Sequence, residues 1–281
     1  SRTLTCLSLE IKATIQAEGD RGRTMLTSTF VHLKGIGPST ERRLWEGGIA
    51  DWAAFRREPH IPGISPSRKT LYDDDLASAQ EQLDRRNASY FADCLPTRDH
   101  WRLFRTFGPR ALYLDIETTG LSAHEGQVTI VGLYRQGRMR TLVGGQDLTR
   151  GAIQEEIDQA DLLITFFGSV FDIPYLQTCF SGLQVPIPHF DLCFAARRVG
   201  LQGGLKHIER ELDIARESDL LTLDGMEAVR LWHHYQAGDE AALDQLIRYN
   251  AADTRNLEPL AEWLYDRLTM RYGPQSLLPI G

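Results

Sequence analysis

Hydrophobic and polar positions after residue 110 alternate in patterns that predict strands and helices in turn. Residues 111–117, ALYLDIE, form an apolar run of strand-forming residues that stops at a Thr-Thr-Gly sequence, as expected for a buried strand. The following stretch, QVTIVGLYRQGRMRTLVGG, predicts a hairpin that turns at Gln136 and Gly137. A hairpin supplies antiparallel strands. We therefore expect an α/β domain with a mixed sheet.

Two carboxylates interrupt the apolar strand. Because strand side chains alternate between faces, Asp115 and Glu117 share one face, while Leu114 and Ile116 point to the other. Two buried like charges cost several kcal/mol unless a cation lies between them, and an oxygen-ligated divalent metal ion is the usual remedy. The alternative is a solvated strand end that carries two ordinary acids.

Two further acids are expected on helices. The stretch ADLLITFFGSVFDIPYL, residues 160–176, predicts a strand, a turn at Gly168 and Ser169, and a helix whose first turn holds Asp172. An acid just beyond a buried strand lies at the sheet edge where ligand sites form. The alternative is an acid that only stabilises the start of the helix.

A late stretch, LIRYNAADTRNLEPLAEWL, has the apolar spacing of a helix that faces the core. Tyr249 and Asp253 are spaced i, i+4 on it, so they share a face one turn apart. Alone, this pair is weak evidence, because such spacing is more often a packed tyrosine beside a solvated aspartate. Its value lies in combination with the other acids.

The three strings DIETTGL, FD after a strand, and YxxxD on a late helix together resemble the tyrosine branch of the DEDD exonuclease superfamily. The resemblance covers roughly residues 105–268 and is closest to YprB-type ribonuclease-H-like proteins, through HFDLCFAARR at 189–198 and GLKHIERELDI at 204–214. It implies a ribonuclease-H-like mixed sheet flanked by helices. It also implies removal of nucleotides from 3′ ends with two Mg²⁺ or Mn²⁺ ions.

The resemblance also suggests roles for the five residues. Asp115 is expected to bridge two ions about 4 Å apart, and Glu117 and Asp253 to complete the ion that activates water. Asp172 is expected to act through a water or at the outer shell of the second ion. Tyr249 would orient the attacking water, because a phenol with a pKa near 10 is a poor general base.

Three other residues near these strings have competing interpretations. Phe167 stands where many relatives carry Asn, and we expect it to stack on a base. Asp191 precedes a helix, and we interpret it as an N-cap and not as a fifth ligand. Lys206 follows two glycines near a helix start, where it either contacts a phosphate or is simply solvated.

The stretch FVHLKGIGPSTERRLWEGGI from Phe30 resembles a helix-hairpin-helix motif. Two glycines permit a tight hairpin between helix-like segments, Pro38 suits the first position of the next helix, and exposed backbone N–H groups there can hold a phosphate. The alternative is a turn between packed helices. The residues expected to contact nucleic acid are Gly35, Ile36, Gly37, Ser39, Arg42 and Arg43.

The hairpin pattern partly recurs about 28 residues later, in IPGISPSRKTL. Gly63, Ile64 and Pro66 match the first copy, while Ser65 replaces a glycine. That replacement favours a packing role for the second copy. A tandem pair of hairpins in a small all-α domain is therefore expected.

A chain of 281 residues with 42% hydrophobic content suits two modest domains. Pro96, Gly108 and Pro109 mark the boundary between them. We predict an extension of little structure over residues 1–24 and a tandem helix-hairpin-helix domain over 25–92. A packed linker over 93–110 then leads to a ribonuclease-H-like domain over 111–270 and a tail over 271–281.

The net charge of −7 is unevenly distributed. Through position 108 the chain has 16 basic and 14 acidic residues, and after it 15 basic and 24 acidic. An acidic catalytic domain can rely on bound metal ions for positive charge, while the hairpin domain adds contacts to the phosphate backbone.

The cysteines and the hydropathy pattern indicate a cytoplasmic protein. Cys6, Cys94, Cys179 and Cys193 show no CxxC spacing, as expected for free thiols in a reducing cytosol. No apolar run approaches the roughly 18 residues of a membrane span. No membrane partner is expected.

These observations favour a metal-dependent 3′ to 5′ exonuclease on single-stranded or frayed DNA, with the hairpin domain holding an adjoining duplex. DNA is favoured over RNA as the partner. The alternatives are an RNA-trimming exoribonuclease and a structure-specific endonuclease. A non-catalytic nucleic-acid-binding module is disfavoured because all four acids and Tyr249 are present.

Overall fold

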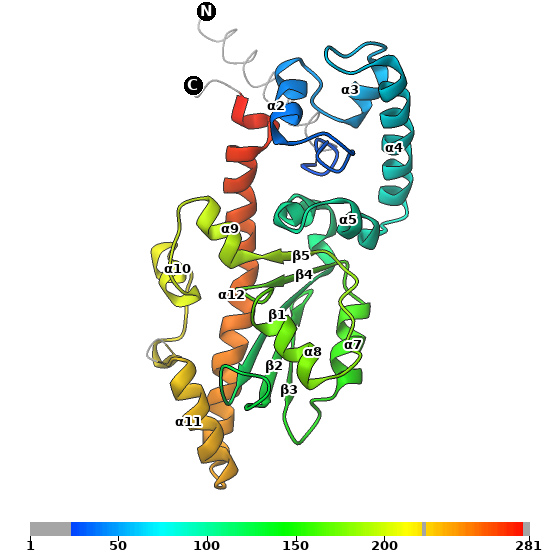
Figure 1. Cartoon of the computed structure of the whole chain (residues 1–281). Helices are drawn as coiled ribbons and strands as arrows, with labels where there is room; N and C mark the ends of the chain where they lie inside the picture. Colours follow the sequence, from blue (N-terminus) through cyan, green and yellow to red (C-terminus); the bar gives the residue numbers. More distant parts are fainter. Residues whose placement is uncertain (1–23, 221–222, 278–281) are drawn as a thin grey trace, which may run out of the picture.

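The computed structural model describes residues 24–220 and 223–277. The predicted extension, except Thr24, lies outside the described residues, and so do Cys6 and the last four residues of the predicted tail. The described chain forms a five-stranded mixed sheet flanked by helices, with a helical region before it (Figure 1). The predicted α/β class is confirmed. Among the described helices, none is long and apolar enough to cross a membrane.

The sheet has the strand order β3-β2-β1-β4-β5. Central β1 pairs antiparallel with β2 and parallel with β4, β2 pairs antiparallel with β3, and β4 pairs parallel with β5. The predicted hairpin is confirmed: Gln136 and Gly137 join β2 to β3 with φ values of 52° and 76°, as a type I′ turn requires. The strands span Ala111–Thr118, Val128–Arg135, Arg138–Val143, Leu162–Thr165 and His189–Asp191.

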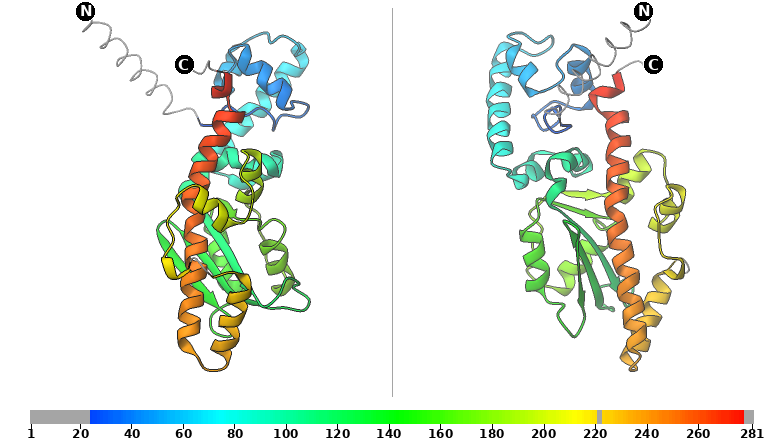
Figure 2. Two further views of the ribbon diagram at one scale, coloured as in Figure 1. Left: turned by 90° about the vertical axis from the view of Figure 1, so that its left-hand side faces the viewer. Right: turned by 180° about the vertical axis from the view of Figure 1, so that it is seen from behind.

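Helices cover both faces of the sheet. Leu112, Leu114 and Ile116 of β1 belong to a buried cluster with residues of α7 (Arg150–Asp158) and α8 (Asp172–Cys179). The long helix α12, Glu240–Tyr272, covers the opposite face and runs from the sheet to the N-terminal helices (Figure 2). The alternation along β1 therefore directs Asp115 and Glu117 toward α12.

Shorter elements complete the α12 side of the molecule. Helix α11 packs along the N-terminal half of α12. Helix α9 packs against α12 nearer the N-terminal helices (Figure 1). Helix α10 and the turn η3 lie between α9 and α11 in the chain. Their bounds are Leu192–Arg198 for α9, Leu205–Glu211 for α10, Ser218–Leu220 for η3 and Gly225–Gln236 for α11.

The region before the sheet is helical, with one departure from the expected pattern. Its elements are α2 (Pro38–Glu46), α3 (Trp52–Arg57), α4 (Pro66–Asp84), α5 (Ala88–Cys94), η1 (Thr97–Leu103), α6 (Phe104–Phe107) and η2 (Gly108–Arg110). The segment before α2 forms successive turns, although a helix is expected there from the sequence. The reason is a contact with α2: the Glu41 carboxylate accepts the backbone N–H groups of Phe30 at 2.6 Å and Val31 at 3.3 Å.

One continuous buried cluster joins the N-terminal helices to the sheet. It extends from Met25 through Trp101 and Phe107 to Leu268 of α12. A buried ion pair crosses the same region, because Arg102 Nη1 lies 2.9 Å from the Glu41 carboxylate. Shared packing thus fixes the first predicted helix-hairpin-helix segment, from Phe30 to Ile49, relative to the sheet.

Candidate active site

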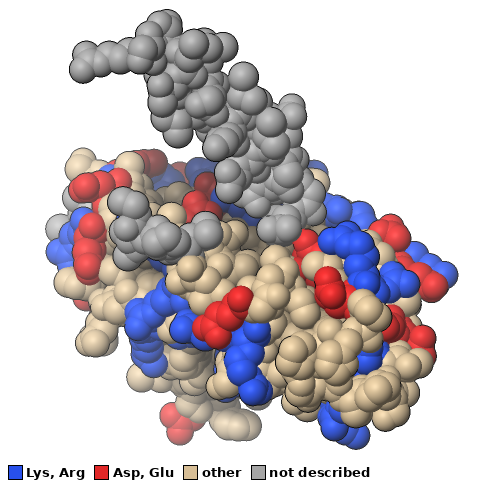
Figure 3. Space-filling view, turned by 90° about the horizontal axis from the view of Figure 1, so that it is seen from above, with Lys and Arg blue, Asp and Glu red and all other residues tan. Residues whose placement is uncertain are grey.

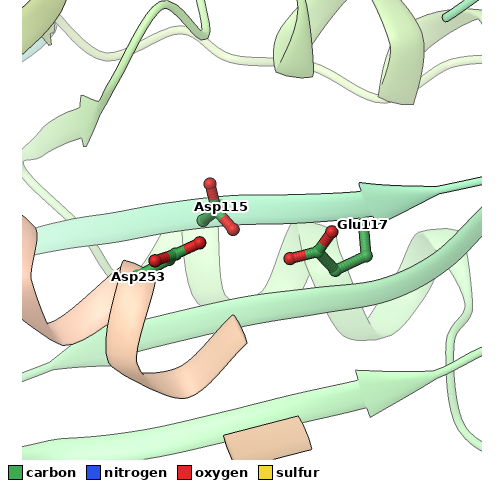
Figure 4. Close-up of side chains that lie close together, drawn as sticks. All are labelled: Asp115, Glu117 and Asp253. Carbon is green, nitrogen blue, oxygen red and sulfur yellow. The ribbon is translucent and has the colours of Figure 1, made fainter. Parts of the chain in front are cut away.

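Three carboxylates from two elements meet beside the sheet. Asp115 and Glu117 extend from β1, and Asp253 extends from α12 toward them (Figure 4). One ligand oxygen of each lies within 4.8 Å of the others. The strand alternation and the helix face predicted from the sequence therefore converge at one point.

A glycine on the neighbouring strand lets α12 come close enough for this meeting. Gly132 of β2 pairs with Asp115, and a Cβ at that position would lie 2.2 Å from Thr254 Oγ1 and 2.3 Å from Asn250 Oδ1. With only hydrogen there, Asn250 Nδ2 reaches Asp115 Oδ2 at 2.9 Å and donates a hydrogen bond. Asn250 thereby orients Asp115, a role that sequence reasoning missed. Its i, i+3 spacing to Asp253 was the available signal.

The acids carry unfavourable charge in the absence of a cation. Burial raises the pKa of Asp115 well above its usual range, and the neighbouring charges of Asp253 and Glu117 raise it further. Burial likewise raises the pKa of Glu117, with Asp253 adding to the effect. A set of clustered oxygen donors whose ionised forms repel one another fits a divalent hard cation such as Mg²⁺ or Mn²⁺.

Asp172 lies in the first turn of α8 and lines the same cavity, outside the group of three close carboxylates found among the described residues. Burial raises its pKa to about 7, while hydrogen bonds to the backbone at Asp172 and Ile116 oppose the rise. The sequence placed it correctly at the start of a helix beyond β4.

Two cationic side chains lie against the acidic group. Lys206 donates a hydrogen bond of 2.8 Å to the hydroxyl of Tyr249 and another to the Leu223 carbonyl oxygen. Arg216 donates to the Asp253 carboxylate and, at 2.8 and 3.0 Å, to Glu209. The Arg216 side chain is 2% exposed. Sequence reasoning missed Arg216 and Glu209, since no local pattern marks a loop arginine that reaches a helix.

Tyr249 is buried beside Asp253 on α12, as the i, i+4 spacing predicts. Burial raises the pKa of its phenol, and the negative charge of Asp253 raises it further. Lys206 donates to its oxygen, so the phenolic O–H can act as a donor, and a side-chain hydrogen bond with Asp253 also raises its pKa. The group is therefore a hydrogen-bond donor at neutral pH.

The acids form one wall of a cavity of about 810 Å³. Asp115, Glu117, Asp172, Tyr249 and Asp253 all line it. Large apolar side chains are exposed at its rim, because the exposed fractions of Leu121, Met226 and Phe167 are 91%, 78% and 37%, and the exposed Asp224 and Arg230 also line it. Acidic groups thus lie inside the cavity and large apolar side chains lie at its mouth.

Asp191 has the capping role that the sequence predicts. Its carboxylate accepts the Cys193 N–H at 3.1 Å at the start of α9. It also accepts the N–H groups of Phe167 at 2.9 Å and Ser169 at 3.0 Å, together with the Ser169 hydroxyl at 2.5 Å. Asp191 therefore holds the loop in which Phe167 adopts a left-handed φ of 67°.

The hairpin residues lie away from the acids, at the other end of the molecule (Figure 1). Gly35 has a φ of +90°, Gly37 precedes α2, and Ile36 is only 5% exposed and belongs to the buried cluster. A contact from Ile36 would thus have to come from its backbone. Basic and acidic side chains are interspersed on this end (Figure 3), where the side chains of Ser39, Arg42 and Arg43 are exposed.

Residues 112–265 match the family model of the RNase H superfamily. The chain belongs to the RNase H superfamily. The matched segment of this RNase H superfamily member runs from β1 into the last third of α12. It contains the four acids and Tyr249, and it leaves out helices α2 to α6.

Solved structures that resemble this chain include an apo nuclease, an NrnC protein and a family B DNA polymerase. An apo nuclease is 22% identical over 62% of this chain and 78% of its own, with a TM-score of 0.43. NrnC of Brucella melitensis bound to pGG is 24% identical over 65% and 81%, with a TM-score of 0.45. The family B DNA polymerase of the archaeon Pyrobaculum calidifontis is 17% identical over 60% and 26%, with a TM-score of 0.49. No curated protein matches this RNase H superfamily member significantly.

Proposed function

We propose that this RNase H superfamily member is a metal-dependent nuclease of the tyrosine branch of the DEDD exonucleases, and that it removes nucleotides from 3′ ends. The observation that carries the proposal is the meeting of Asp115, Glu117 and Asp253 within 4.8 Å beside Asp172 and Tyr249 in one cavity. Single-stranded or frayed DNA is the favoured substrate. RNA is the alternative.

The carboxylates of Asp115, Glu117 and Asp253 would hold two Mg²⁺ or Mn²⁺ ions. When bound, such ions supply an activated water and stabilise charge on the leaving oxygen. Glu117 and Asp253 complete the group of close ligands, and Asp172, outside the group of three, acts from further away. Asn250 holds Asp115 in place by its hydrogen bond of 2.9 Å.

Tyr249 and Lys206 would act together on the attacking water and the phosphate. Because the pKa of Tyr249 is raised, the phenol positions a water by hydrogen bonding and does not remove its proton. Lys206 orients the phenol and, like Arg216, adds positive charge beside the acidic group. Charge of this kind stabilises a phosphate more strongly in a partly buried site than in water.

The exposed apolar side chains at the rim suit a nucleotide whose base is unpaired. Leu121, Met226 and Phe167 present large side chains at the cavity mouth, where a base or sugar can contact them. Stacking on an aromatic ring is worth about 1–3 kcal/mol per base and tolerates any sequence. This supports processing of a free end in preference to paired strands.

The first hairpin would hold the phosphate backbone of an adjoining duplex. No side chain caps α2 at Gly37, and the space around that glycine is open within 4 Å. In the second hairpin Ser65 caps α4 itself by accepting the Arg68 N–H at 3.4 Å. The first copy therefore keeps amide donors for a phosphate, beside exposed Arg42 and Arg43.

Digestion of end-labelled nucleic acid tests the proposal. We expect 5′-labelled single-stranded DNA to yield a ladder of shortened products with Mg²⁺ or Mn²⁺ and none with a chelator. Asp115→Asn should reduce cleavage to the level of the chelated protein, while the amide oxygen keeps an acceptor for Asn250. A variant with undiminished cleavage would overturn the assignment of the acids.

The same assay separates the alternatives. If RNA is shortened faster than DNA, RNA is the substrate. Products cut at internal positions would indicate endonuclease action. A shift in mobility without cleavage under all metal conditions would show a binding module and contradict the proposed activity.

A further inference from the structure

Two partly exposed phenylalanines lie together beside the active-site cavity. The ring centroids of Phe167 and Phe194 are 5.9 Å apart, with 34° between the ring planes. The residues are 37% and 39% exposed, and neither belongs to the three buried clusters of the described residues. Core packing therefore does not account for the pair. Adjacent aromatic rings that remain exposed to solvent are typical of a binding surface.

The pair stands between two cavities. Phe167 lines the active-site cavity, and Phe194 lines a second cavity of about 230 Å³ between η1 and α9. Trp101, Phe190 and Ala195 give the second cavity apolar walls. The two phenylalanines thus connect the acidic site with an apolar recess of a different kind.

Guanidinium groups surround the recess. Arg98 and Arg198 line it, and both lie near one carboxylate, Asp99, at 3.6 and 3.9 Å. Arg197 places its guanidinium 5.3 Å from the centre of the Phe194 ring. Arg102 also lies 3.4 Å from Asp99, but Glu41 balances its charge. The other three arginines thus outnumber the two nearby acids, Asp99 and Asp191, and leave positive charge at the mouth of the recess. This is unlike the acidic cavity beside it.

Asp191 holds both rings in place. One of its oxygens accepts the Phe167 N–H at 2.9 Å, and the same oxygen accepts the Cys193 N–H that caps α9, the helix that carries Phe194. Its other oxygen accepts two hydrogen bonds from Ser169. The loop and the helix are therefore tied to one carboxylate, so the rings are arranged before any ligand arrives.

We propose that the recess is a second nucleotide site, which takes an unpaired base of the same strand whose end lies in the active-site cavity. Phe194 stacks on that base, Phe167 stacks on its neighbour, and Arg98 and Arg197 contact the linking phosphates. Asp191 is a positioning residue for both rings. The inference rests on the proposed nuclease function and adds the path that the strand follows.

The length dependence of cleavage tests the site. We measure kcat/KM with Mn²⁺ for labelled oligothymidylates of two to eight nucleotides, for the unaltered protein and for Phe194→Ala, Phe194→Trp and Met270→Ala. A filled second site should raise kcat/KM of the unaltered protein as the strand lengthens. Phe194→Ala should lose roughly 5- to 100-fold of that gain, mainly through KM, whereas Phe194→Trp should retain it because an aromatic face remains.

Met270→Ala is the matched control, because Met270 is an exposed apolar residue of α12 that lines neither cavity. It should behave as the unaltered protein. An equal length dependence in Phe194→Ala and Met270→Ala, with equal unfolding midpoints, would overturn the second site. Equal loss in Phe194→Ala and Phe194→Trp would also overturn it, since stacking would then not be the cause.

Binding in a chelator separates failure of this site from failure of the nuclease function. An octanucleotide with 2-aminopurine at successive positions reports stacking by loss of fluorescence. We expect quenching at one internal position that Phe194→Ala removes, and Arg98→Gln should reduce the salt dependence of binding by about one phosphate contact. If no strand is cleaved but this quenching is seen, the nuclease function fails and the site stands. Absent quenching would reject the site even in an active enzyme.

Discussion

The ammonium group of Lys206 donates a hydrogen bond of 2.8 Å to the hydroxyl of Tyr249. The two residues lie 43 positions apart, on α10 and α12. The contact leaves the phenolic O–H on the side of Asp253, with which Tyr249 shares a side-chain hydrogen bond, and brings a positive charge to the edge of an acidic site. Burial lowers the pKa of Lys206, while the neighbouring charge of Asp253 raises it.

Replacing Lys206 should impair turnover more than folding. Lys206→Met keeps the aliphatic stem but removes the charge and the hydrogen bond to Tyr249, so we expect kcat to fall roughly 10- to 100-fold on single-stranded DNA. Lys206→Arg should recover part of the loss because it keeps the charge. The measurement is steady-state cleavage at saturating Mn²⁺, alongside thermal unfolding. An unchanged kcat in Lys206→Met would exclude a role for this pair in the reaction.

The metal-free protein should lose stability as pH rises through the range in which Asp172 ionises. Burial raises its folded pKa to about 7, from the 3.8 of an unperturbed aspartate, so the folded state holds the proton to higher pH than the unfolded state. Stability contributed by this group is therefore present at low pH and lost between about pH 4 and pH 7. Asp172→Asn should flatten the decline, and Mg²⁺ should offset it.

Three histidines oppose this trend and define the control, because burial lowers the pKa values of His32, His100 and His189. The pKa values of His32 and His189 are lowered by burial to about 4, so they remove stability as pH falls below about 6.5. The Asp172 effect is therefore read as the difference between the unaltered protein and Asp172→Asn in chelator, from unfolding midpoints at pH 5 to 8. A difference independent of pH would contradict it.

Gly132 should tolerate no side chain. An added Cβ would lie 2.2 Å from Thr254 Oγ1 and 2.3 Å from Asn250 Oδ1, so Gly132→Ala must push α12 from the sheet. We expect a loss of about 1–3 kcal/mol in the free energy of unfolding, together with weaker metal binding. Gly151→Ala on α7 is the matched control, because nothing lies within 4 Å of its added carbon. Equal denaturant midpoints for the two variants would refute this account.

Arg216 should stabilise the protein most when metal is absent. It is buried between Asp253 and Glu209, and removing one partner of a buried ion pair costs about 3–5 kcal/mol. Arg216→Gln should therefore unfold more easily in chelator, and added Mg²⁺ should raise its midpoint more than that of the unaltered protein, because the ion then has sole access to Asp253.

The matched control for Arg216 is Arg248→Gln. Arg248 pairs with Glu217 and Asp219 at the surface, where solvent screens the ion pairs and they contribute little to stability. Calorimetric unfolding with and without Mg²⁺ provides both comparisons. A metal-induced shift in Arg216→Gln no larger than in Arg248→Gln would show that Arg216 and the ion do not share Asp253.

Local patterns in the sequence determined the parts from which the candidate site is built. Alternation along 111–117 put Asp115 and Glu117 on one face of a strand, and the i, i+4 spacing put Tyr249 beside Asp253. The cap at Asp191 follows in the same way. These features depend on strand and helix periods and on hydrogen bonds to nearby backbone, so a short stretch of residues is enough to predict them.

The tertiary structure alone decided which of these parts meet and what lies between them. Asn250 reaches Asp115 only because Gly132 admits α12 to the sheet, and Arg216 reaches Asp253 from a loop without a regular pattern. The turns before α2 replace the expected helix because Glu41 binds their N–H groups. In each case the partner lies in another segment of the chain, and packing of whole elements sets the distance, which no local period encodes.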